Sequence, residues 1–401
     1  SKILLNSLNK IGIKKSLAVF IISMVTPSRP GDLPFAIDIT ALSISSTDAI
    51  MKKRVSARLV LKTGESFTGF APSTQTPEMS GEVIFNTGMQ GYVESLTDPS
   101  YAGQILCFTY PLIGNYGVSA RNTWESDKIQ VKAIVTSELA PFYSNHSAQS
   151  SLLNCLEAEN VAYITGVDTR ALTHCLREKG VTPGIIITHL DEPTSDFIEF
   201  ETIDWVKQVT ISEPRYYGEH GKTIIVVDCG LKENILRCLL QFPLKIKRVP
   251  YDYDYSQEDY DGVFVSNGPG DPQRCEQTIA ILKKALARKK PCFGICLGTQ
   301  LMALAVGAKT YKLIFGHRSQ NQPCLYLPTK RCYLTSQNHG YAVDEKTLPK
   351  DWRVLFRNLN DASIAGIEHK KDPFFSVQFH PEAAPGPTDT QWLFERFYRM
   401  L

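Results

Sequence analysis

The 401-residue sequence predicts an α/β protein built from two domains. Short strands that alternate apolar and polar residues, separated by turn residues, fill the first half and indicate a mixed α+β domain. In the second half, continuously apolar strands alternate with amphipathic helices, which is typical of a mainly parallel sheet flanked by helices. We place the first domain at residues 55–205, a linker that contains Pro214, Gly218 and Gly221 at 206–221, and the second domain at 222–401.

Composition narrows the possible functions. Apolar residues make up 43% of the chain and charged residues 21%, which excludes a disordered or fibrous protein. The 43 Lys and Arg residues nearly balance the 41 Asp and Glu residues, so we expect no binding to nucleic acid or to a membrane. The ten cysteines contain no CxxC pair, which predicts a reducing, cytoplasmic compartment and no metal site.

The N-terminal residues 1–54 differ from the rest. Up to Gly31 they contain five basic residues and no acidic one, with an apolar run of nine residues from Leu17 to Val25. This run is too short to span a bilayer, which needs about 20 residues. We interpret the stretch as an extension that is either disordered or a targeting segment for a plastid or mitochondrion, because transit peptides are basic and poor in acidic residues.

The elements of both domains follow from apolar periodicity and its breaks. In the first domain we expect strands at Ala57–Lys62, Ser66–Phe70, Glu82–Thr87 and Gln104–Tyr110. A helix is predicted over Asp168–Lys179, with Gly180 as its stop. In the second domain we expect strands at Thr223–Val227, Gly262–Val265 and Cys292–Ile295, and helices at Glu233–Phe242 and Arg274–Arg288. Ligands of such sheets bind beyond the carboxyl ends of the strands.

Cys296 is the candidate nucleophile of the second domain. It lies between a buried strand and a helix predicted over Thr299–Val306, and Gly294 and Gly298 flank it. Such a tight turn lifts the side chain above the sheet, and the N-terminus of the following helix favours the reactive thiolate. A lone cysteine is usually a core residue, and we interpret Cys292 in that way. The flanking glycines favour a functional interpretation of Cys296.

His380 and Glu382 are the candidate partners of this thiol. They end the segment Phe375–Glu382, which begins as an apolar strand. Because residues i and i+2 of an extended chain point to one face, Glu382 can hold the His380 imidazole in one tautomer, as the acidic member of a triad does. A surface loop of the sequence His-Pro-Glu is the alternative, and the cysteine turn disfavours it.

The segment Ser266–Pro272 follows a predicted strand and contains Gly268 and Gly270. A β-turn before a helix is one interpretation. The other is that the glycines let backbone N–H groups approach the oxyanion that forms in acyl transfer. No GxxxxGK[ST] sequence occurs, so we predict no nucleotide phosphate loop.

Several motifs together resemble those of a known family. The second domain resembles a class I glutamine amidotransferase in the segments Gly294–Gly298, Ser266–Pro272, Ser336–Tyr341 and His380–Glu382. The first domain resembles the carbamoyl-phosphate synthase small-subunit family in the segments Glu82–Met89, Leu96–Tyr101, Tyr110–Gly117, Asp168–Arg170 and Leu176–Gly180. The resemblance runs from about residue 55 to the C-terminus.

This resemblance implies an enzyme that hydrolyses L-glutamine, with Cys296 as nucleophile, His380 as base and Glu382 orienting His380. The substrate-binding residues that it implies are Ser100, Gly268, Gly270, Leu297, Gln300, Asn338, Gly340 and Tyr341. Among them, the backbone N–H groups of Gly270 and Leu297 hold the oxyanion. The resemblance implies no cofactor in this chain. In a heterodimer, ammonia passes to a large synthetase subunit, which uses bicarbonate, ATP and Mg²⁺ to make carbamoyl phosphate for arginine or pyrimidine biosynthesis.

The sequence departs from the family at Thr299, where many relatives have His, and at Ser319 and Gln322, where Gly and His are usual. Because Thr299 lies beside the triad, we expect activity to be retained. An amidotransferase subunit of another synthase is one alternative, and the first domain argues against it. A non-catalytic assembly subunit is a second, against which the intact Cys296 argues. A cysteine peptidase or γ-glutamyl hydrolase would leave the first domain unexplained.

Overall fold

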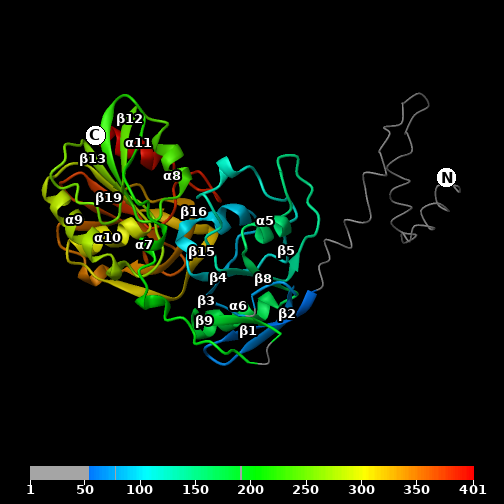
Figure 1. Ribbon diagram of the computed structural model, residues 1–401. Coiled ribbons are helices and arrows are strands. Elements are labelled where there is room, and N and C mark those ends of the chain that lie inside the picture. The colour runs from blue at the N-terminus through cyan, green and yellow to red at the C-terminus, as the bar shows by residue number, and fades with distance from the viewer. Residues whose placement is uncertain (1–53, 77, 190–191) are drawn as a thin grey trace, which may run out of the picture. The chain divides into compact units, whose positions relative to one another are not determined.

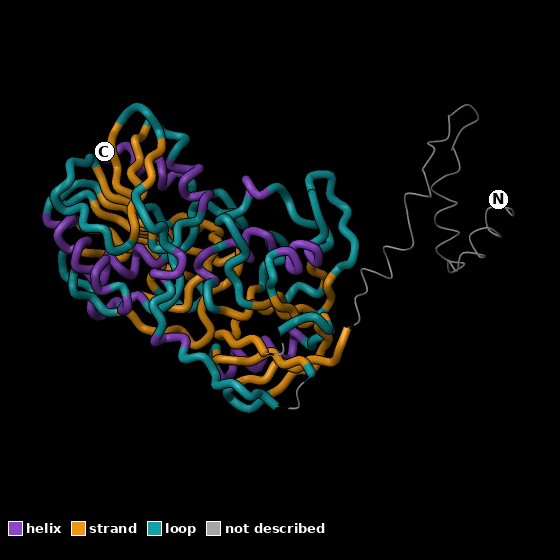
Figure 2. The backbone as a smooth tube through the Cα atoms, viewed as in Figure 1, coloured by secondary structure: helices purple, strands orange, loops and turns teal. Residues whose placement is uncertain are grey.

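The computed structural model describes residues 54–76, 78–189 and 192–401, which belong to one unit of the chain (Figure 1). The predicted extension at 1–54 lies outside these residues except for Arg54. The described residues form a barrel followed by a larger sheet with helices against it (Figure 2). No helix within the described ranges is long and apolar enough to cross a membrane.

The first domain is a closed barrel in which the strands follow the order β1-β2-β8-β6-β4-β3-β9. Its strands are β1 (Arg54–Leu61), β2 (Ser66–Pro72), β3 (Glu78–Asn86), β4 (Gln104–Phe108), β6 (Ala133–Thr136), β8 (Ala162–Thr165) and β9 (Thr182–Thr188). Neighbours among β3, β4, β6 and β8 are parallel, and the other neighbours are antiparallel. A separate two-stranded sheet is formed by β5 (Leu112–Ile113) and β7 (Glu138–Leu139).

Burial alternates along the first barrel strand because successive side chains point to opposite faces of a sheet. In β1, Ala57, Leu59 and Leu61 are buried, and Arg58 and Val60 between them are partly exposed. This alternation is the signal that predicted the strand from the sequence. The buried residues of β1 join the apolar core inside the barrel.

The predicted helix of the first domain is confirmed as α6 (Thr169–Lys179). Leu172 and Leu176 pack into the barrel core. The Asp168 carboxylate caps the helix by accepting a hydrogen bond from Ala171 N at 2.9 Å, and the chain leaves the helix at a glycine. The other helices of this domain are α4 (Tyr92–Thr97) and α5 (Leu152–Ala158).

The stretch at 206–221, predicted to be a linker, contains two elements, α7 (Val206–Val209) and β10 (Arg215–Tyr217). β10 pairs antiparallel with β12 (Leu244–Pro250) and forms one edge of the second sheet. Pro214 and Gly218 therefore lie at the two ends of an edge strand, where such residues are tolerated. The second sheet thus begins inside the predicted linker.

The second domain contains a ten-stranded sheet in the order β10-β12-β11-β13-β14-β19-β18-β17-β15-β16. Its remaining strands are β11 (Lys222–Asp228), β13 (Gly262–Val265), β14 (Cys292–Ile295), β15 (Thr310–Tyr326), β16 (Arg331–Val343), β17 (Trp352–Asn358), β18 (Ile364–His369) and β19 (Phe374–Val377). The five strands from β12 to β19 in this order are parallel, as the apolar runs predict. Antiparallel strands extend the sheet on both sides.

Helices pack on both faces of the parallel part. They are α8 (Glu233–Leu239), α9 (Glu276–Ala287), α10 (Leu297–Ala305) and α11 (Trp392–Met400). Val263 and Val265 of β13 belong to a core with residues of α9 and α10, whereas Phe264 between them belongs to a core with residues of α8 and α11. A strand that is buried on both faces is continuously apolar, which explains why the sequence does not alternate here.

Candidate active site

The turn at Cys296 joins β14 to α10. Cys296 has φ +53° and ψ −103°, a backbone conformation that residues other than glycine rarely adopt. A Cβ at Gly298 would lie 2.3 Å from Val265 O, and one at Gly294 would lie 2.8 Å from Gly298 O. The two glycines therefore leave the room that this tight strand-to-helix turn requires.

His380 follows β19, the strand next to β14 in the parallel sheet. His380 N donates a hydrogen bond to Ser336 O at 2.9 Å, which fixes its backbone. Nδ1 of His380 lies 2.7 Å from Glu382 Oε1, and both side chains are buried. Burial excludes the alternative of a surface loop. Nε2 of His380 is buried with no hydrogen-bond partner, so it is available for proton transfer.

Neighbouring charged groups shift the pKa values of His380 and Glu382. Burial lowers the pKa of His380, but the Glu382 carboxylate and the neighbouring Cys296 side chain raise it to about 10. Burial raises the pKa of Glu382, but Lys232 and His380 lower it to about 2. Both groups are therefore charged at neutral pH.

Lys232 is a further member of this cluster, which the sequence patterns did not reveal. Its Nζ lies 2.9 Å from Glu382 Oε1 and donates a hydrogen bond to Ala383 O at 2.7 Å. Its side chain is only 3% exposed. Lys232 follows β11 and directly precedes α8, where a cation opposes the helix dipole. That unfavourable position is a sequence signal that an anion lies nearby.

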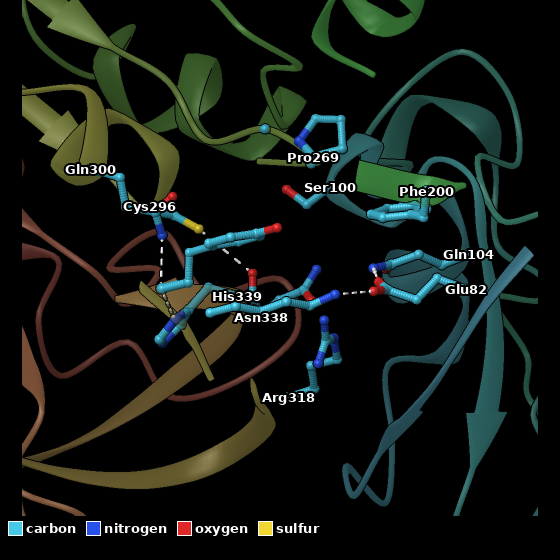
Figure 3. Close-up of a pocket in the computed structure, with 15 residues that line it drawn as sticks. Glu82, Ser100, Gln104, Phe200, Pro269, Cys296, Gln300, Arg318, Asn338 and His339 are labelled. Carbon is cyan, nitrogen blue, oxygen red and sulfur yellow. Dashed lines mark hydrogen bonds and ion pairs between the residues drawn. The ribbon is translucent and has the colours of Figure 1, made fainter. Parts of the chain in front are cut away.

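The thiol faces a pocket that both domains line (Figure 3). The pocket contains about 440 Å³ of space not occupied by atoms, which includes open solvent at its mouth. The predicted substrate-binding residues that line it are Ser100, Gly268, Gly270, Gln300, Asn338, Gly340 and Tyr341. Leu297 is not among the lining side chains and begins α10 behind Cys296. The structure thus brings seven of the eight predicted residues to one cavity that Cys296 also lines.

Asp98 and Asn267 join the two domains beside the thiol. Asn267 Nδ2 donates a hydrogen bond to Ser100 Oγ at 2.8 Å, and Ser100 N donates one to Asp98 Oδ1 at 2.9 Å. Asn338 Nδ2 donates a hydrogen bond to Asp98 Oδ2 at 3.0 Å. Asp98 and Asn267 were not predicted as site residues, although both lie in the motifs that indicated the family. Their side chains bind residues of the other domain, so their place in the site can be seen only when both domains are present.

The wall opposite Asn338 is formed by the predicted glycine loop. A Cβ at Gly268 would lie 2.1 Å from Cys229 O, and Gly270 has φ +82°. Both positions therefore require glycine. The assignment of the Gly270 and Leu297 N–H groups to the oxyanion stays a prediction.

The two departures from the family pattern in β15 contact each other. Gln322 Nε2 donates a hydrogen bond to Ser319 Oγ at 2.8 Å, and Gln322 Oε1 accepts one from Asn360 Nδ2 at 2.6 Å. The pairing of β15 with β16 shifts register between Ser319 and Gln322. Gln322 thus joins Ser319 to Asn360 through its two side-chain polar atoms. Thr299, the third departure, is buried in α10 and does not line the pocket.

The side of the pocket toward the first domain carries charged residues that were not predicted. Glu82 of β3 is 3% exposed and lies 2.8 Å from Lys312 Nζ. Gln104 Nε2 of β4 donates a hydrogen bond to Glu82 Oε2 at 2.8 Å. The sequence signal that could have identified Glu82 is a glutamate within an otherwise apolar strand. In the part of the chain that the structure describes, no group of three or more His, Cys, Asp or Glu is placed to hold a metal ion.

Comparison with known proteins assigns both domains. A cysteine turn on a parallel sheet, with a buried His-Glu pair beside it, is the arrangement that the sequence motifs predict for a class I glutamine amidotransferase. The family model described as glutamine amidotransferase class-I matches residues 225–400. The family model of the carbamoyl-phosphate synthase small chain, CPSase domain, matches residues 59–186.

Full-length relatives agree with these matches. The carbamoyl phosphate synthase arginine-specific small chain of Candida albicans is 46% identical over 363 residues, which cover 85% of this chain and 84% of that protein. The chain belongs to the carbamoyl-phosphate synthase small chain family. Multifunctional protein CAD of Squalus acanthias is 47% identical over 85% of this chain, and multifunctional protein pyr1-3 of Dictyostelium discoideum is 45% identical over 84%. This chain spans only 16% of the length of each multifunctional protein.

Proposed function

We propose that this chain is the glutamine-hydrolysing subunit of a carbamoyl-phosphate synthase. The observation that carries the proposal is the buried contact of 2.7 Å between His380 and Glu382, next to Cys296 in a pocket that both domains line. Family membership supports the choice of synthase, because the first domain matches the family model of the carbamoyl-phosphate synthase small chain. No observation favours the amidotransferase subunit of another synthase.

In the first half-reaction, the Cys296 thiolate attacks the side-chain amide carbon of glutamine. Negative charge develops on the amide oxygen, for which the N–H groups of Gly270 and Leu297 are the proposed donors. The His380 imidazolium then gives its proton to the amide nitrogen. The C–N bond breaks, ammonia leaves, and a γ-glutamyl thioester stays on Cys296.

In the second half-reaction, Nε2 of His380 takes a proton from water, and the resulting hydroxide attacks the thioester carbon. The C–S bond breaks, which restores the Cys296 thiolate and leaves His380 as the imidazolium, and the new carboxylic acid of glutamate loses its proton to solvent as it leaves. Glu382 holds Nδ1 of His380 throughout, at 2.7 Å, so that Nε2 handles both proton transfers.

A second cavity supports an enclosed route for ammonia. It contains about 290 Å³ of space not occupied by atoms, and residues of both domains line it, among them Tyr101, Gln320, Asn338 and His380. Asn338 also lines the pocket in front of Cys296. Because His380 gives its proton to the amide nitrogen that leaves as ammonia, a path that starts at His380 suits the departing molecule.

The proposed consumer of this ammonia is the large synthetase subunit of the same enzyme, in a heterodimer. That subunit supplies the bicarbonate, ATP and Mg²⁺ chemistry that makes carbamoyl phosphate, for use in arginine or pyrimidine biosynthesis. We propose that this chain holds no cofactor of its own. A cytoplasmic location stays a prediction from the sequence.

The proposal is tested by trapping the covalent intermediate. The full chain is mixed with glutamine, quenched with acid after short times, digested and examined by mass spectrometry. A γ-glutamyl adduct on the peptide that carries Cys296, formed and lost as glutamate accumulates, is the expected result. Glutamate release without an adduct on that peptide, or neither product, contradicts the proposal.

A further inference from the structure

Glu125 of the first domain is a fully buried carboxylate that the proposed reaction does not use. It lies against the start of α8 in the second domain. Its Oε2 accepts a hydrogen bond from Asn234 N at 3.0 Å, and its Oε1 accepts one from Arg237 Nη1 at 3.2 Å. The backbone O of Glu125 accepts a third from Glu233 N at 2.9 Å. Glu125 lines neither the substrate pocket nor the second cavity.

The same turn of α8 contacts the triad from its other side. Asn234 Nδ2 donates a hydrogen bond to the backbone O of Glu382 at 2.6 Å. Lys232 Nζ donates one to Glu382 Oε1 at 2.9 Å. Asn234 therefore binds the Glu125 carboxylate through its backbone and the backbone O of Glu382 through its side chain, so one residue links Glu125 to Glu382.

Glu125 is also tied to the segment of the first domain that reaches the substrate pocket. Glu125 N donates a hydrogen bond to Thr97 Oγ1 at 3.0 Å. Thr97 directly precedes Asp98, whose carboxylate binds Ser100 N and Asn338 Nδ2. Glu125 is thus expected to move together with the residues of the first domain that line the pocket.

We propose that Glu125 is a positioning residue for glutamine hydrolysis, which sets the orientation of Glu382 through Asn234 and Lys232 according to how the first domain is seated. This inference rests on the proposed function. Glu125 acts through other residues and touches neither substrate nor thiol. A buried carboxylate is suited to this task because it accepts several hydrogen bonds in one fixed geometry.

The charge of Glu125 is expected to depend on pH near neutrality. The charged groups that face it are Lys232, Arg237 and Glu382. Burial raises its pKa, against the opposing effect of the two cations, to about 7. Protonation weakens the hydrogen bonds from Asn234 N and Arg237, so the positioning effect is complete above about pH 7 and is reduced as the pH falls below it.

The test compares Glu125→Gln and Glu125→Ala with wild type in the full chain, by glutamate release from about pH 5.5 to about pH 8.5, on both sides of this pKa. Glu368→Gln is the matched control. Glu368 is also buried, and its carboxylate pairs with Arg353 and Arg396. It makes no contact with the residues of the site among the described contacts, so the control measures the general cost of removing a buried charge.

For Glu125→Ala we expect kcat to fall about 10- to 100-fold, the size of effect that a displaced catalytic group produces, with a change in KM of less than about threefold. Glu125→Gln keeps one oxygen acceptor, so its kcat should match that of wild type below about pH 7. Because the amide does not ionise, its kcat should not increase through about pH 7 as that of wild type does. Glu368→Gln should keep both the wild-type kcat and the rise.

A kcat for Glu125→Ala equal to that of wild type, or lowered no more than by Glu368→Gln, overturns the inference. If Glu125→Ala does not fold, the inference is tested by Glu125→Gln. A rise of kcat with pH that this variant retains does not come from Glu125 and contradicts the inference. Failure of the proposed function gives a different result, in which wild type releases no glutamate or Cys296→Ala releases as much as wild type.

Discussion

Asp98 of the first domain accepts a hydrogen bond from Asn338 of the second at 3.0 Å, and this contact joins the two walls of the substrate pocket. The other oxygen of the same carboxylate accepts from Ser100 N at 2.9 Å. One buried carboxylate therefore orients a pocket residue from each domain. Because Cys296 Sγ lies 3.5 Å from the backbone O of Asn338, this arrangement also borders the nucleophile.

Replacement of Asp98 by Ala should raise the KM for glutamine about tenfold. Hydrogen bonds to a charged group contribute about 1.5–3 kcal/mol, and both pocket residues lose their anchor at once. Steady-state glutamate release measures the effect. Asp127→Ala, which removes an exposed acidic side chain of the same domain, is the control and should keep the wild-type KM. An unchanged KM in Asp98→Ala would show that the contact does not position substrate.

Replacement of Cys296 by Ser should lower glutamine hydrolysis by about 10³-fold or more, because the hydroxyl is a far weaker nucleophile than the thiolate. Synthesis from added ammonia by the complex with the large subunit should persist, since it does not use the thiol. Cys292→Ala, four residues earlier in the buried strand, should leave glutamine turnover nearly intact. Loss of ammonia-dependent synthesis in a folded Cys296→Ser complex contradicts the assignment.

Replacement of Gly298 by Ala tests the geometry of the cysteine turn. The new Cβ would lie 2.3 Å from Val265 O, which is backbone and cannot move aside, so α10 must shift. We expect a destabilisation of about 1–3 kcal/mol together with a loss of glutaminase activity of about 100-fold. Gly307→Ala is the control, because φ is +87° there but no atom lies within 4 Å. It should lose stability alone. Equal activities in the two variants argue against the steric requirement.

Replacement of Lys232 by Met should lower the free energy of unfolding by about 3 kcal/mol at pH 7, because it breaks a buried ion pair. The pKa of Glu382 falls in the folded protein from 4.5 to about 2, so the stabilisation is complete above about pH 4.5 and is lost as the pH falls toward 2. Urea unfolding should therefore find a difference between variant and wild type that shrinks in acid.

Lys284→Met is the control for this comparison. Its ion pair with Asp254 is exposed, with side-chain exposures of 58% and 48%. It should cost less than about 1 kcal/mol at any pH. A stability difference for Lys232→Met that stays constant down to acid pH would mean that its ion pair with Glu382 is not the source.

The sequence predicted the features that depend on local patterns. Gly294 and Gly298 predicted the cysteine turn because the residues that leave room for a tight turn lie next to it in the sequence. Continuous apolar runs marked the parallel strands because burial on both faces leaves no polar position. Closure of the barrel was not predicted, since the pairing of β1 with β9 joins segments more than a hundred residues apart, for which periodicity gives no signal.

The unpredicted site residues share the same cause. Lys232 is 150 positions in the sequence from its partner Glu382, which was predicted, and Asp98 is 240 positions from its partner Asn338, which was also predicted. Each is an ordinary polar residue by itself, and only the fold shows that it is buried against a partner. Long-range contacts of this kind hold Cys296, His380 and the pocket in one arrangement, although Cys296 and His380 themselves were visible in local motifs.

The division of the site between two domains predicts control by the partner subunit. Asp98 and Ser100 come from the first domain and Cys296 from the second, so a small shift between them misplaces substrate relative to thiol. We expect the isolated chain to release glutamate slowly, the complex with the large subunit faster, and the complex with bicarbonate and MgATP fastest, with a total rise of about 5- to 150-fold, the usual range of coupling between sites. Parallel assays of glutamate release measure the three rates. Equal rates would identify an autonomous glutaminase in which the domain contacts carry no control.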